Sequence, residues 1–388
     1  MLNLSYPPPL SLYIHYPWCV QKCPYCDFNS HQLKVKKENK KQQNKRYIDA
    51  LINDLENELG SIWGRSIYSI FIGGGTPSLF EAEELDYLLC RLKAILNILP
   101  MTEITLEANP GTIDYIKFAE FRQLGINRLS IGIQSFNNTQ LELLGRIHNS
   151  KDAIKSVENA HQAGFEQINL DLMFALPKQS LKQALSDVQT AIDLKPQHIS
   201  YYQLTIEQNT FFAQQPPVLP SDDLSYNIQQ KGHLLLSQHG FNQYEISAWS
   251  KKNCQCKHNI NYWQFGDYLG IGAGAHGKIT MVAEQTIYRN WKLKQPQQYL
   301  NSAKKKYLGG KKKLSESDLI FEFMLNASRL SQGFKLELFT QSTGLDFKKL
   351  QYKLNPAIDQ GLISINNNII CPTSRGFNYL NNLQELFL

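Results

Sequence analysis

Long apolar segments are missing from this sequence. No run of eighteen or more apolar residues is present that could span a membrane. The start of the chain also has no basic segment followed by a long apolar one, so we expect no signal peptide. Biased composition is missing as well, because 42% of the residues are hydrophobic and 19% are charged. These absences predict a cytoplasmic globular protein, whose 388 residues suffice for one large core and a smaller appended domain.

Cysteines are also few, and they are unevenly placed. Of the seven, three lie within eight residues, with the spacing CxxxCxxC at Cys19, Cys23 and Cys26. An odd number of cysteines in a chain without an export signal favours metal ligation over a disulfide framework. Thiolates bind iron–sulfur clusters or zinc, and a closed zinc site needs four ligands. Three thiolates on a four-iron cluster leave one iron open to a substrate, whereas an electron-carrying cluster usually takes four cysteines.

Two alternatives to a cluster remain open on spacing alone. His15 could complete a Cys₃His zinc site with the same three thiols, or the thiols could belong to a packed core. Cys254 and Cys256, in the segment CxCKHN, could add heme or metal contacts, or they could be free cysteines.

Six short apolar runs alternate with amphipathic stretches along the first half of the chain. Near-continuous apolar strands between helices are typical of parallel βαβ units that are buried on both faces. Polar and glycine-rich residues follow these strands, and in α/β barrels that rim carries the active site. Periodicity alone fits either an open doubly wound sheet or a partial barrel. The expected strands are Ser11–Pro17, Ser66–Gly75, Glu103–Pro110, Arg128–Ser135, Gln167–Leu176 and His198–Glu207, and the expected helices are Arg46–Leu59, Glu81–Leu96, Ile113–Leu124, Lys151–Ala163 and Leu181–Leu194.

The pattern changes after residue 207, and we expect three parts. Residues 1–207 form the α/β core, and residues 208–300 form an extension with a proline-rich link, a helix and the segment Gly266–Gly277. Residues 301–388 are expected to form a small winged-helix-like α+β domain with a strand pair at Leu362–Asn366 and Ile369–Pro372.

Much of the net charge of +6 lies in two lysine-rich runs, one at Lys34–Arg46 and the other at Lys304–Lys306 with Lys311–Lys313. Such runs are usually solvated loops. They also attract anionic groups, such as porphyrin propionates, phospholipid headgroups or an acidic redox partner. Aromatic residues are not interleaved with these lysines, so we do not expect nucleic acid as a partner.

The cysteine motif carries a family resemblance. CxxxCxxC with an aromatic residue, Tyr25, just before the third cysteine resembles the radical S-adenosylmethionine (SAM) superfamily. The resemblance implies a partial (β/α)6 TIM-like barrel and a [4Fe-4S] cluster whose open iron chelates the amino and carboxylate groups of SAM. One-electron reduction would then cleave SAM to methionine and a 5′-deoxyadenosyl radical. By the same resemblance, the residues that bind SAM are Tyr13, Tyr25, Gly74, Gly75, Thr76, Glu107, Gln134, Arg146 and Asp171.

Over residues 11–300 the chain resembles the coproporphyrinogen-oxidase-like radical SAM proteins, in which two functions compete. The oxygen-independent coproporphyrinogen III oxidases carry the motif CxxxCxxCxC and a long arm before it. Here Phe28 replaces the fourth cysteine, and only eighteen residues precede Cys19. The HemW-type heme chaperones carry phenylalanine at that position and a motif HNxxYW, which this chain matches at residues 258–263. The chaperone is therefore the favoured interpretation.

The HNxxYW segment suits heme chemically. His258 could be an axial ligand of heme iron, and Tyr262 and Trp263 could pack on the porphyrin face. The plainer interpretation is a histidine that caps a helix beside two buried aromatic residues. His276 is a second axial candidate, and we expect the whole segment to lie far from the cluster.

The resemblance to heme chaperones also implies a set of partners. These are heme, a heme-acceptor protein such as a membrane-bound respiratory enzyme, a low-potential electron donor and a peripheral contact with the membrane. An iron–sulfur or heme carrier that never cleaves SAM remains an alternative, as does the oxidase.

Overall fold

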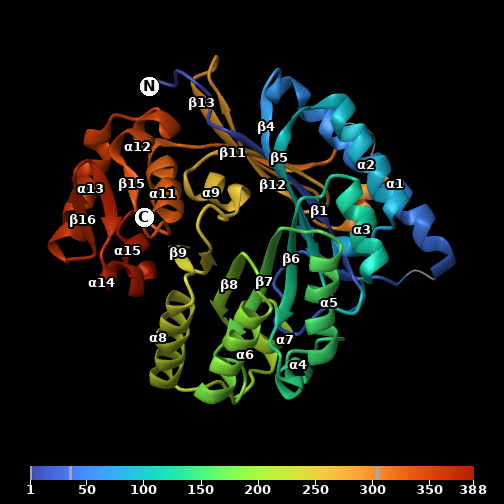
Figure 1. Ribbon diagram of the computed structural model, residues 1–388. Coiled ribbons are helices and arrows are strands. Elements are labelled where there is room, and N and C mark those ends of the chain that lie inside the picture. Colours follow the sequence, from blue (N-terminus) through green and yellow to red (C-terminus); the bar gives the residue numbers. More distant parts are fainter. Residues whose placement is uncertain (1, 35–36, 303–305) are drawn as a thin grey trace.

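The computed structural model describes residues 2–34, 37–302 and 306–388. All six expected strands are present, and they lie side by side in parallel in the order β1-β4-β5-β6-β7-β8. They curve around an open interior with their helices on the outer face, which makes the sheet a partial barrel rather than a flat doubly wound sheet (Figure 1). The strands are β1 (Leu10–Tyr16), β4 (Ser66–Gly74), β5 (Asn97–Ala108), β6 (Arg128–Gln134), β7 (Gln167–Phe174) and β8 (His198–Gln203).

The helices of the barrel follow the strands as the periodicity predicts, with one difference at the beginning. Helix α1 starts at Lys37, so most of the first lysine-rich run is helical instead of a solvated loop. Residues 35 and 36 of that run lie outside the described part of the chain. The outer helices are α1 (Lys37–Ile62), α2 (Ala82–Ile95), α3 (Tyr115–Gln123), α5 (Ser150–Gln162), α6 (Leu181–Asp193) and α8 (Asp222–Gln238), with short α4 (Asn138–Leu143) and α7 (Phe211–Gln214) between them.

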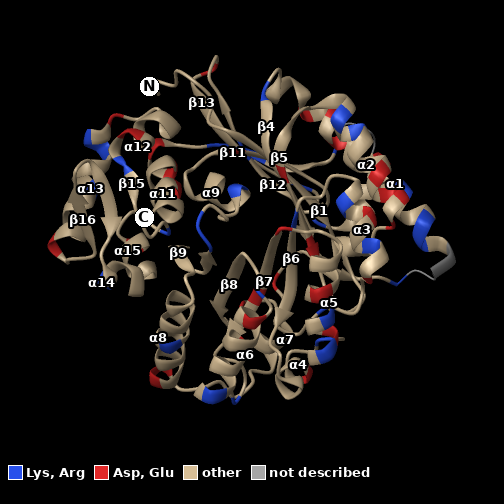
Figure 2. Ribbon diagram, in the orientation of Figure 1, with Lys and Arg blue, Asp and Glu red and all other residues tan. Residues whose placement is uncertain are grey.

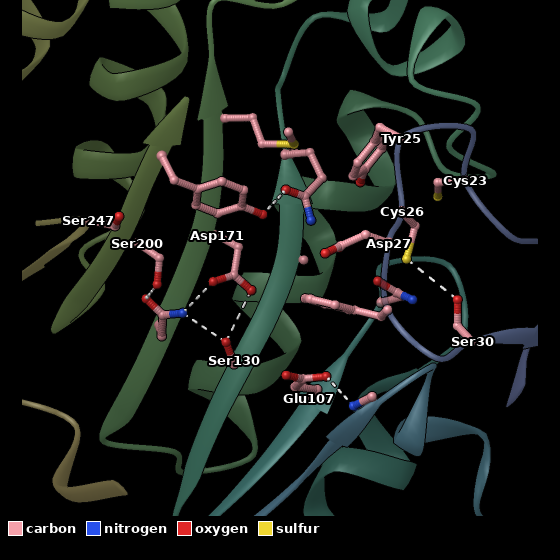
Figure 3. Close-up of a pocket in the computed structure, with 18 of the residues that line it drawn as sticks. Cys23, Tyr25, Cys26, Asp27, Ser30, Glu107, Ser130, Asp171, Ser200 and Ser247 are labelled. Atoms are coloured by element: carbon pink, nitrogen blue, oxygen red, sulfur yellow. Dashed lines mark hydrogen bonds between the residues drawn. The ribbon is translucent and has the colours of Figure 1, made fainter. Parts of the chain in front are cut away.

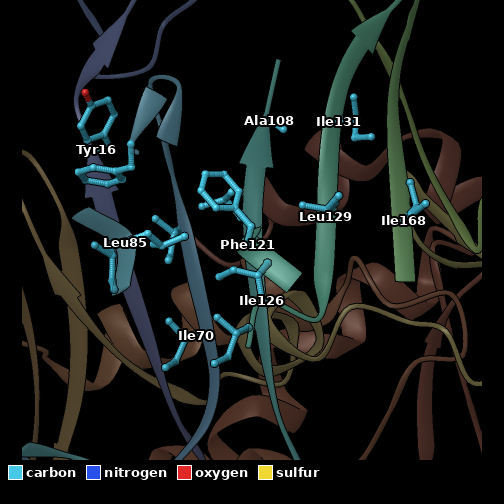
Figure 4. Packing of buried hydrophobic residues seen from close by; sticks show 14 of the residues in the cluster. Tyr16, Ile70, Leu85, Ala108, Phe121, Ile126, Leu129, Ile131 and Ile168 are labelled. Atoms are coloured by element: carbon cyan, nitrogen blue, oxygen red, sulfur yellow. The ribbon is translucent and has the colours of Figure 1, made fainter. Parts of the chain in front are cut away.

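Buried apolar side chains on the strands explain why the helices stay in place. The barrel core includes Ile70, Leu129 and Ile131 on the strands and Leu85 and Phe121 on the helices that cover them (Figure 4). These side chains are almost fully shielded from water. Burial of each large apolar side chain contributes about 1.5–3 kcal/mol. The apolar runs in the sequence are therefore the strands that supply the apolar surface on which the outer helices pack.

The main sheet continues past both edges of the parallel strands. On one side β11 (Asp267–Ile271) pairs in parallel with β1, and the sheet then runs on antiparallel through β12 (His276–Met281), β13 (Thr286–Lys292) and β14 (Leu308–Lys313). On the other side β10 (Ala248–Ser250) and β9 (Asn242–Glu245) follow β8. Residues 208–300 thus contribute strands to both edges of the barrel.

Asp267 at the start of β11 fixes the new edge strand. Its carboxylate is fully buried and accepts hydrogen bonds from Arg65 (2.8 Å), Lys278 (2.9 Å) and Thr280 (2.8 Å). Burial raises the pKa of this carboxyl, but the two neighbouring cations outweigh that effect and hold the pKa below its ordinary value. The ion cluster therefore joins β11 and β12 to the segment before β4.

The C-terminal part forms a separate apolar core beside the barrel (Figure 1). Helices α11, α12 and α13 pack on a small sheet of order β15-β17-β16, and Phe323 and Phe339 meet edge to face within this core at 5.2 Å. The expected strand pair is present. The elements are α11 (Glu316–Ala327), β15 (Phe334–Lys335), α12 (Leu336–Thr343), α13 (Phe347–Asp359), β16 (Ile363–Asn366), β17 (Ile369–Pro372), α14 (Ser374–Asn378) and α15 (Leu380–Glu385).

Charged residues mark the outer surfaces of the helices (Figure 2). Of the second lysine-rich run, Lys311–Lys313 lie on the exposed edge strand β14, and residues 304 and 305 lie outside the described part of the chain. Within the described residues, no helix has the length and apolar character that crossing a membrane requires.

Candidate functional site

A cavity of about 650 Å³ opens at the carboxyl ends of the parallel strands; we call it the inner cavity. One wall is the loop after β1, which carries the three clustered cysteines. The opposite wall comes from β7 and β8 and from the region of α9 (Lys257–Trp263). Among its lining residues are Cys19, Cys23, Tyr25, Cys26, Gly74, Gly75, Thr76, Glu107, Gln134, Arg146, Asp171, Cys256 and Trp263.

The cysteine loop is held at its base by backbone pairing. Short strands β2 (Trp18–Cys19) and β3 (His31–Gln32) pair in parallel, so the intervening residues project as a loop into the cavity. The Cys26 thiol lies 3.4 Å from the Ser30 hydroxyl, and the Arg146 guanidinium donates to the Cys23 sulfur at 3.5 Å. Burial raises the pKa of Cys19 and Cys26.

The donor set fits a [4Fe-4S] cluster better than a zinc ion. Both ring nitrogens of His15 are engaged, one with the Tyr13 hydroxyl (2.9 Å) and one with the Asn29 carbonyl (3.0 Å). Within the described residues, no three His, Cys, Asp or Glu side chains converge as they would around one metal ion. Cluster ligands bind different irons and stand farther apart than the ligands of a single ion. Three thiols on one wall of a shared cavity, one of them beside a cation, suit the cluster.

The glycine segment after β4 is required by close packing. Gly74 has φ +109°, and a Cβ built there would lie 2.5 Å from the His15 ring. A Cβ on Gly75 would lie 2.5 Å from the Trp18 carbonyl oxygen. Only glycine lets this backbone pass so close to the cysteine loop, where the Gly75 N–H donates to the Tyr16 carbonyl at 2.7 Å and the Thr76 N–H to the Trp18 carbonyl at 2.8 Å.

Two carboxylates line the inner cavity, Glu107 from β5 and Asp171 from β7, with β6 between these two strands (Figure 3). Glu107 accepts a hydrogen bond from the Gly74 N–H at 3.0 Å. Burial, together with the nearby charge of Asp171, raises the pKa of Glu107 to about 8. Asp171 accepts from Ser130 (3.1 Å) and Asn169 (2.8 Å), and burial raises its pKa as well. A ligand ammonium, or a pair of ribose hydroxyls that donate hydrogen bonds, would offset the repulsion between these two carboxylates.

The remaining rim residues form a chain of hydrogen bonds. Asn109 links Thr76 (2.8 Å) to Arg146 (2.7 Å), and Arg146 also donates to the Gly132 carbonyl. Gln134, held at φ +68°, accepts from the Tyr202 hydroxyl at 2.7 Å. Tyr202 is a rim residue that the sequence reasoning missed, whereas Asn109 was expected at the rim but was given no role. The position of Tyr202 could have identified it, because it too lies at the carboxyl end of a strand.

Tyr13 is the one expected SAM residue that does not line the inner cavity. It lines a neighbouring cavity of about 470 Å³, which we call the outer cavity. Asp27, Phe28, Gly74 and Glu107 border both cavities, so the two share a wall. The other residues of the outer cavity are Tyr13, His15, Asn29, Tyr262, Tyr268, Gly274, Ala275, His276, Trp291, Lys292 and Lys294.

Comparison with known proteins identifies the family. The radical SAM superfamily model matches residues 13–191, and the HemN C-terminal domain model matches residues 314–378. The chain is 49% identical over 385 residues to the heme chaperone HemW of Haemophilus influenzae, covering 98% of each chain. It is 45% identical to the Escherichia coli heme chaperone HemW, again over 98% of each, and 34% identical to that of Lactococcus lactis, covering 98% of this chain and 97% of the relative. The chain belongs to the HemW family.

The fold agrees with a solved structure that carries a different name. Escherichia coli coproporphyrinogen III oxidase (HemN), described as a radical SAM enzyme, superposes with a TM-score of 0.82 at 22% identity, covering 98% of this chain and 90% of that one. The likeness confirms the predicted partial barrel with its C-terminal additions for this HemW-family chain.

The HNxxYW segment forms α9 and divides between the two cavities. His258 is only 3% exposed, and its Nδ1 lies 3.0 Å from the Ser69 hydroxyl. Trp263 lines the inner cavity, and the guanidinium carbon of Arg329 lies 4.3 Å from the centroid of its ring. Tyr262 lines the outer cavity. The segment lies on the wall of the inner cavity opposite the cysteine loop and packs on β1, β4 and β11. The pairing of β11 with β1 brings the segment to the barrel, where Asn261 donates to the Ser11 hydroxyl at 2.9 Å and to the Asp267 carbonyl at 2.8 Å.

Both nearby cysteines are free of disulfides, and both thiols make hydrogen bonds with neighbouring residues. Cys256 is buried before α9, and its thiol donates to Glu103 at 3.6 Å. Burial raises the pKa of Cys256 to about 12, so the thiol stays protonated at neutral pH. The Cys254 sulfur accepts a hydrogen bond from Gln167 at 3.7 Å.

Proposed function

We propose that the chain is a heme chaperone of the HemW family, which binds a [4Fe-4S] cluster, SAM and heme and delivers heme to acceptor proteins. The observation that carries the proposal is the pair of cavities with a common wall. One holds the three thiols and the polar rim, and the other is open and lined with aromatic residues. The names of the full-length relatives support the same function.

Cys19, Cys23 and Cys26 would hold the cluster, and the open iron would take SAM. When bound and reduced, the cluster supplies the single electron that cleaves the sulfonium of SAM. The backbone at Gly74–Thr76 and the carboxylate of Glu107 would bind the amino end of SAM. Arg146 would pair with its carboxylate, while Gln134, Asp171 and Tyr25 would contact the sugar and base.

A SAM-binding prediction follows from the glycine segment. The Gly74→Val and Glu107→Ala variants are expected to keep the cluster but to lose most of the change that SAM causes in its paramagnetic signal. Valine at position 74 would collide with the His15 ring, and alanine at 107 would remove the carboxylate. Gly164→Val is a matched control, because Gly164 also has a positive φ (+83°) but has open space around its Cβ position. A normal response to SAM in both rim variants would show that SAM binds elsewhere.

Partners and compartment are part of the same proposal. The chaperone would work in the cytoplasm, receive electrons from a low-potential donor and pass heme to an acceptor such as a membrane-bound respiratory enzyme. The exposed lysines of β14 offer a surface for an acidic donor or for anionic headgroups at a peripheral membrane contact.

The competing function is coproporphyrinogen decarboxylation, and Phe28 distinguishes the two. Its side chain is 58% exposed and borders both cavities, at the position where the oxidases carry a fourth cysteine. We predict that the reconstituted protein, supplied anaerobically with reductant and SAM, forms no protoporphyrinogen. The Phe28→Cys variant should stay inactive too, because one added thiol at the border of the cavities leaves the rest of their lining unchanged. Turnover by the wild type would replace the chaperone with the oxidase.

The decisive test of the proposal is the transfer of heme from this protein to an acceptor protein. The anaerobically reconstituted protein, loaded with one heme, is mixed with an apo-cytochrome, and the acceptor's absorbance is followed with and without SAM. We expect heme to move to the acceptor, and parallel measurement of 5′-deoxyadenosine shows whether SAM is cleaved. Failure of the wild type to bind heme would refute the proposal. Transfer without SAM cleavage would support a carrier that makes no radical.

A further inference from the structure

The histidine of the HNxxYW segment is poorly placed for an incoming heme. His258 is packed between Phe71 and Tyr262, with ring centroids 5.1 Å away on each side, and is almost completely shielded from solvent. Its Nδ1 already interacts with the Ser69 hydroxyl. A porphyrin is far larger than any opening that rotation of one side chain would make here. The axial ligand, if it is a histidine, has to come from another position.

His276 is the histidine with the right access. All nine histidines of the chain lie in its described part, and the other eight are either at least partly buried or have a ring nitrogen bonded to a carbonyl oxygen. His276 is exposed, and within the described structure neither of its ring nitrogens makes a hydrogen bond. Desolvation of the ring at the cavity edge and the charge of Lys294 lower its pKa. The imidazole is therefore neutral at physiological pH, as a metal ligand must be.

The surroundings of His276 match the rest of a heme. Trp291 lies opposite His276 on the neighbouring strand β13, and the two rings are stacked with centroids 6.5 Å apart. On the other wall of the outer cavity, Tyr262 and Tyr268 form an aromatic pair at 4.2 Å. Flat apolar side chains of this kind pack well against a porphyrin. The volume of about 470 Å³ is typical of small-molecule sites, which span about 300–1,000 Å³.

Charge at the mouth of the outer cavity suits the propionates. Lys294 is exposed, and within the described residues its ammonium has no ion-pair partner. Lys292 nearby cannot serve, because its ammonium is buried between Asp54 and Glu58. Lys294 is thus the available cation on this rim for a carboxylate.

We infer that the outer cavity holds the transported heme, with His276 as its axial ligand, Trp291 and Tyr262 against the porphyrin and Lys294 on a propionate. This inference rests on the proposed function and names the site that carries it out. The cavity is open to solvent on one side, so heme stays accessible to an acceptor. Because Phe28 and Glu107 border both cavities, the heme would lie next to the SAM site.

The test is a heme titration of the full-length protein and matched variants, read by the Soret band and by affinity. His276→Ala should weaken binding on the order of ten- to a hundredfold and shift the Soret maximum, as expected when a metal site loses a ligand. Added imidazole should restore the band. His239→Ala is the control, because His239 is also exposed but lies at the end of α8. Iron and sulfide content should be equal in all variants, since none replaces a residue of the cysteine loop.

A second arm isolates the propionate contact. Lys294→Gln should weaken binding of heme but leave binding of its dimethyl ester unchanged, because the ester has no carboxylate to pair. If the wild type binds heme and His276→Ala gives the same affinity and spectrum, the inference is wrong while the chaperone proposal stands. A spectral change in His258→Ala alone would move the ligand to the buried histidine. No heme binding by the wild type would remove both proposals.

Discussion

Replacing any one of Cys19, Cys23 and Cys26 with alanine is expected to abolish the iron–sulfur cluster completely. Each thiolate would hold a different iron, and within the described residues no neighbouring cysteine is positioned to substitute. The Cys256 thiol lines the same inner cavity, but it is bound to Glu103 and sits before α9. The measurement is the paramagnetic resonance spectrum of the reduced protein, together with its iron and sulfide content after anaerobic reconstitution.

Two other cysteines provide matched controls for this experiment. Cys90→Ala changes an exposed thiol on α2, outside both cavities, and should leave the cluster intact. Cys256→Ala tests the stricter case, because it removes a thiol from the wall of the inner cavity itself. We expect it to keep full iron and sulfide content. Loss of the cluster in Cys256→Ala, or unchanged content in all three motif variants, would contradict the assignment of the ligands.

The parallel strands could be predicted from the sequence because burial on both faces leaves a local signal. Strand β6, for example, is buried along its whole length; its apolar residues Leu129, Ile131 and Ile133 alternate with polar or small residues that line the inner cavity and end in Gln134. The rim followed from the same logic, since parallel strands end at one edge of a sheet. Glu107, Gln134 and Asp171 were found in this way, and the structure brings them into one cavity.

The pairing of β1 with β11 could not be predicted, because pairing between distant segments leaves no local pattern. Strand β11 pairs with β1 across more than 250 residues, as in the register of Leu10 with Asp267. That pairing places α9 on the strands of the barrel and makes Trp263 part of the inner cavity, which the sequence did not suggest. The same pairing places Trp263 in the inner cavity and Tyr262 in the outer one. The periodicity of the sequence does not predict this difference.

The start of α1 was missed for a different reason. Lysine, glutamine and asparagine from Lys37 to Arg46 show little apolar periodicity, so the run resembles a solvated loop. Residues of moderate or good helix propensity can still extend a helix once its later turns are packed. Here Tyr47, Leu51 and Leu55 are fully buried and anchor the helix on the sheet. The first turns of α1, before Tyr47, extend the helix that these buried residues anchor.

The Lys292→Met substitution is expected to cause the largest loss of stability. The ammonium of Lys292 is 1% exposed and donates to Asp54 at 2.7 Å and to Glu58 at 2.6 Å. Methionine has a similar length but no charge, so two carboxylates would be left in a buried site without their cation. Breaking a buried ion pair in this way costs about 3–5 kcal/mol, a large part of the total stability of a typical domain. Urea unfolding followed by circular dichroism measures the loss.

An exposed lysine makes the comparison decisive. Lys41 pairs with Glu83 at 2.7 Å, but both side chains are more than 70% exposed, so solvent screens the pair. Lys41→Met should barely move the urea midpoint, although the change of residue is identical. In the Lys292→Met background, Asp54→Asn should recover part of the loss, because it removes one uncompensated charge. Equal midpoints for the two lysine variants would mean that burial of the pair does not determine its contribution to stability.

The ion pair of Lys292 with Asp54 and Glu58 also joins α1 to the end of β13. It lies next to the hydrogen bond from the Lys292 N–H to the Ala275 carbonyl, and so it supports the hairpin that carries His276.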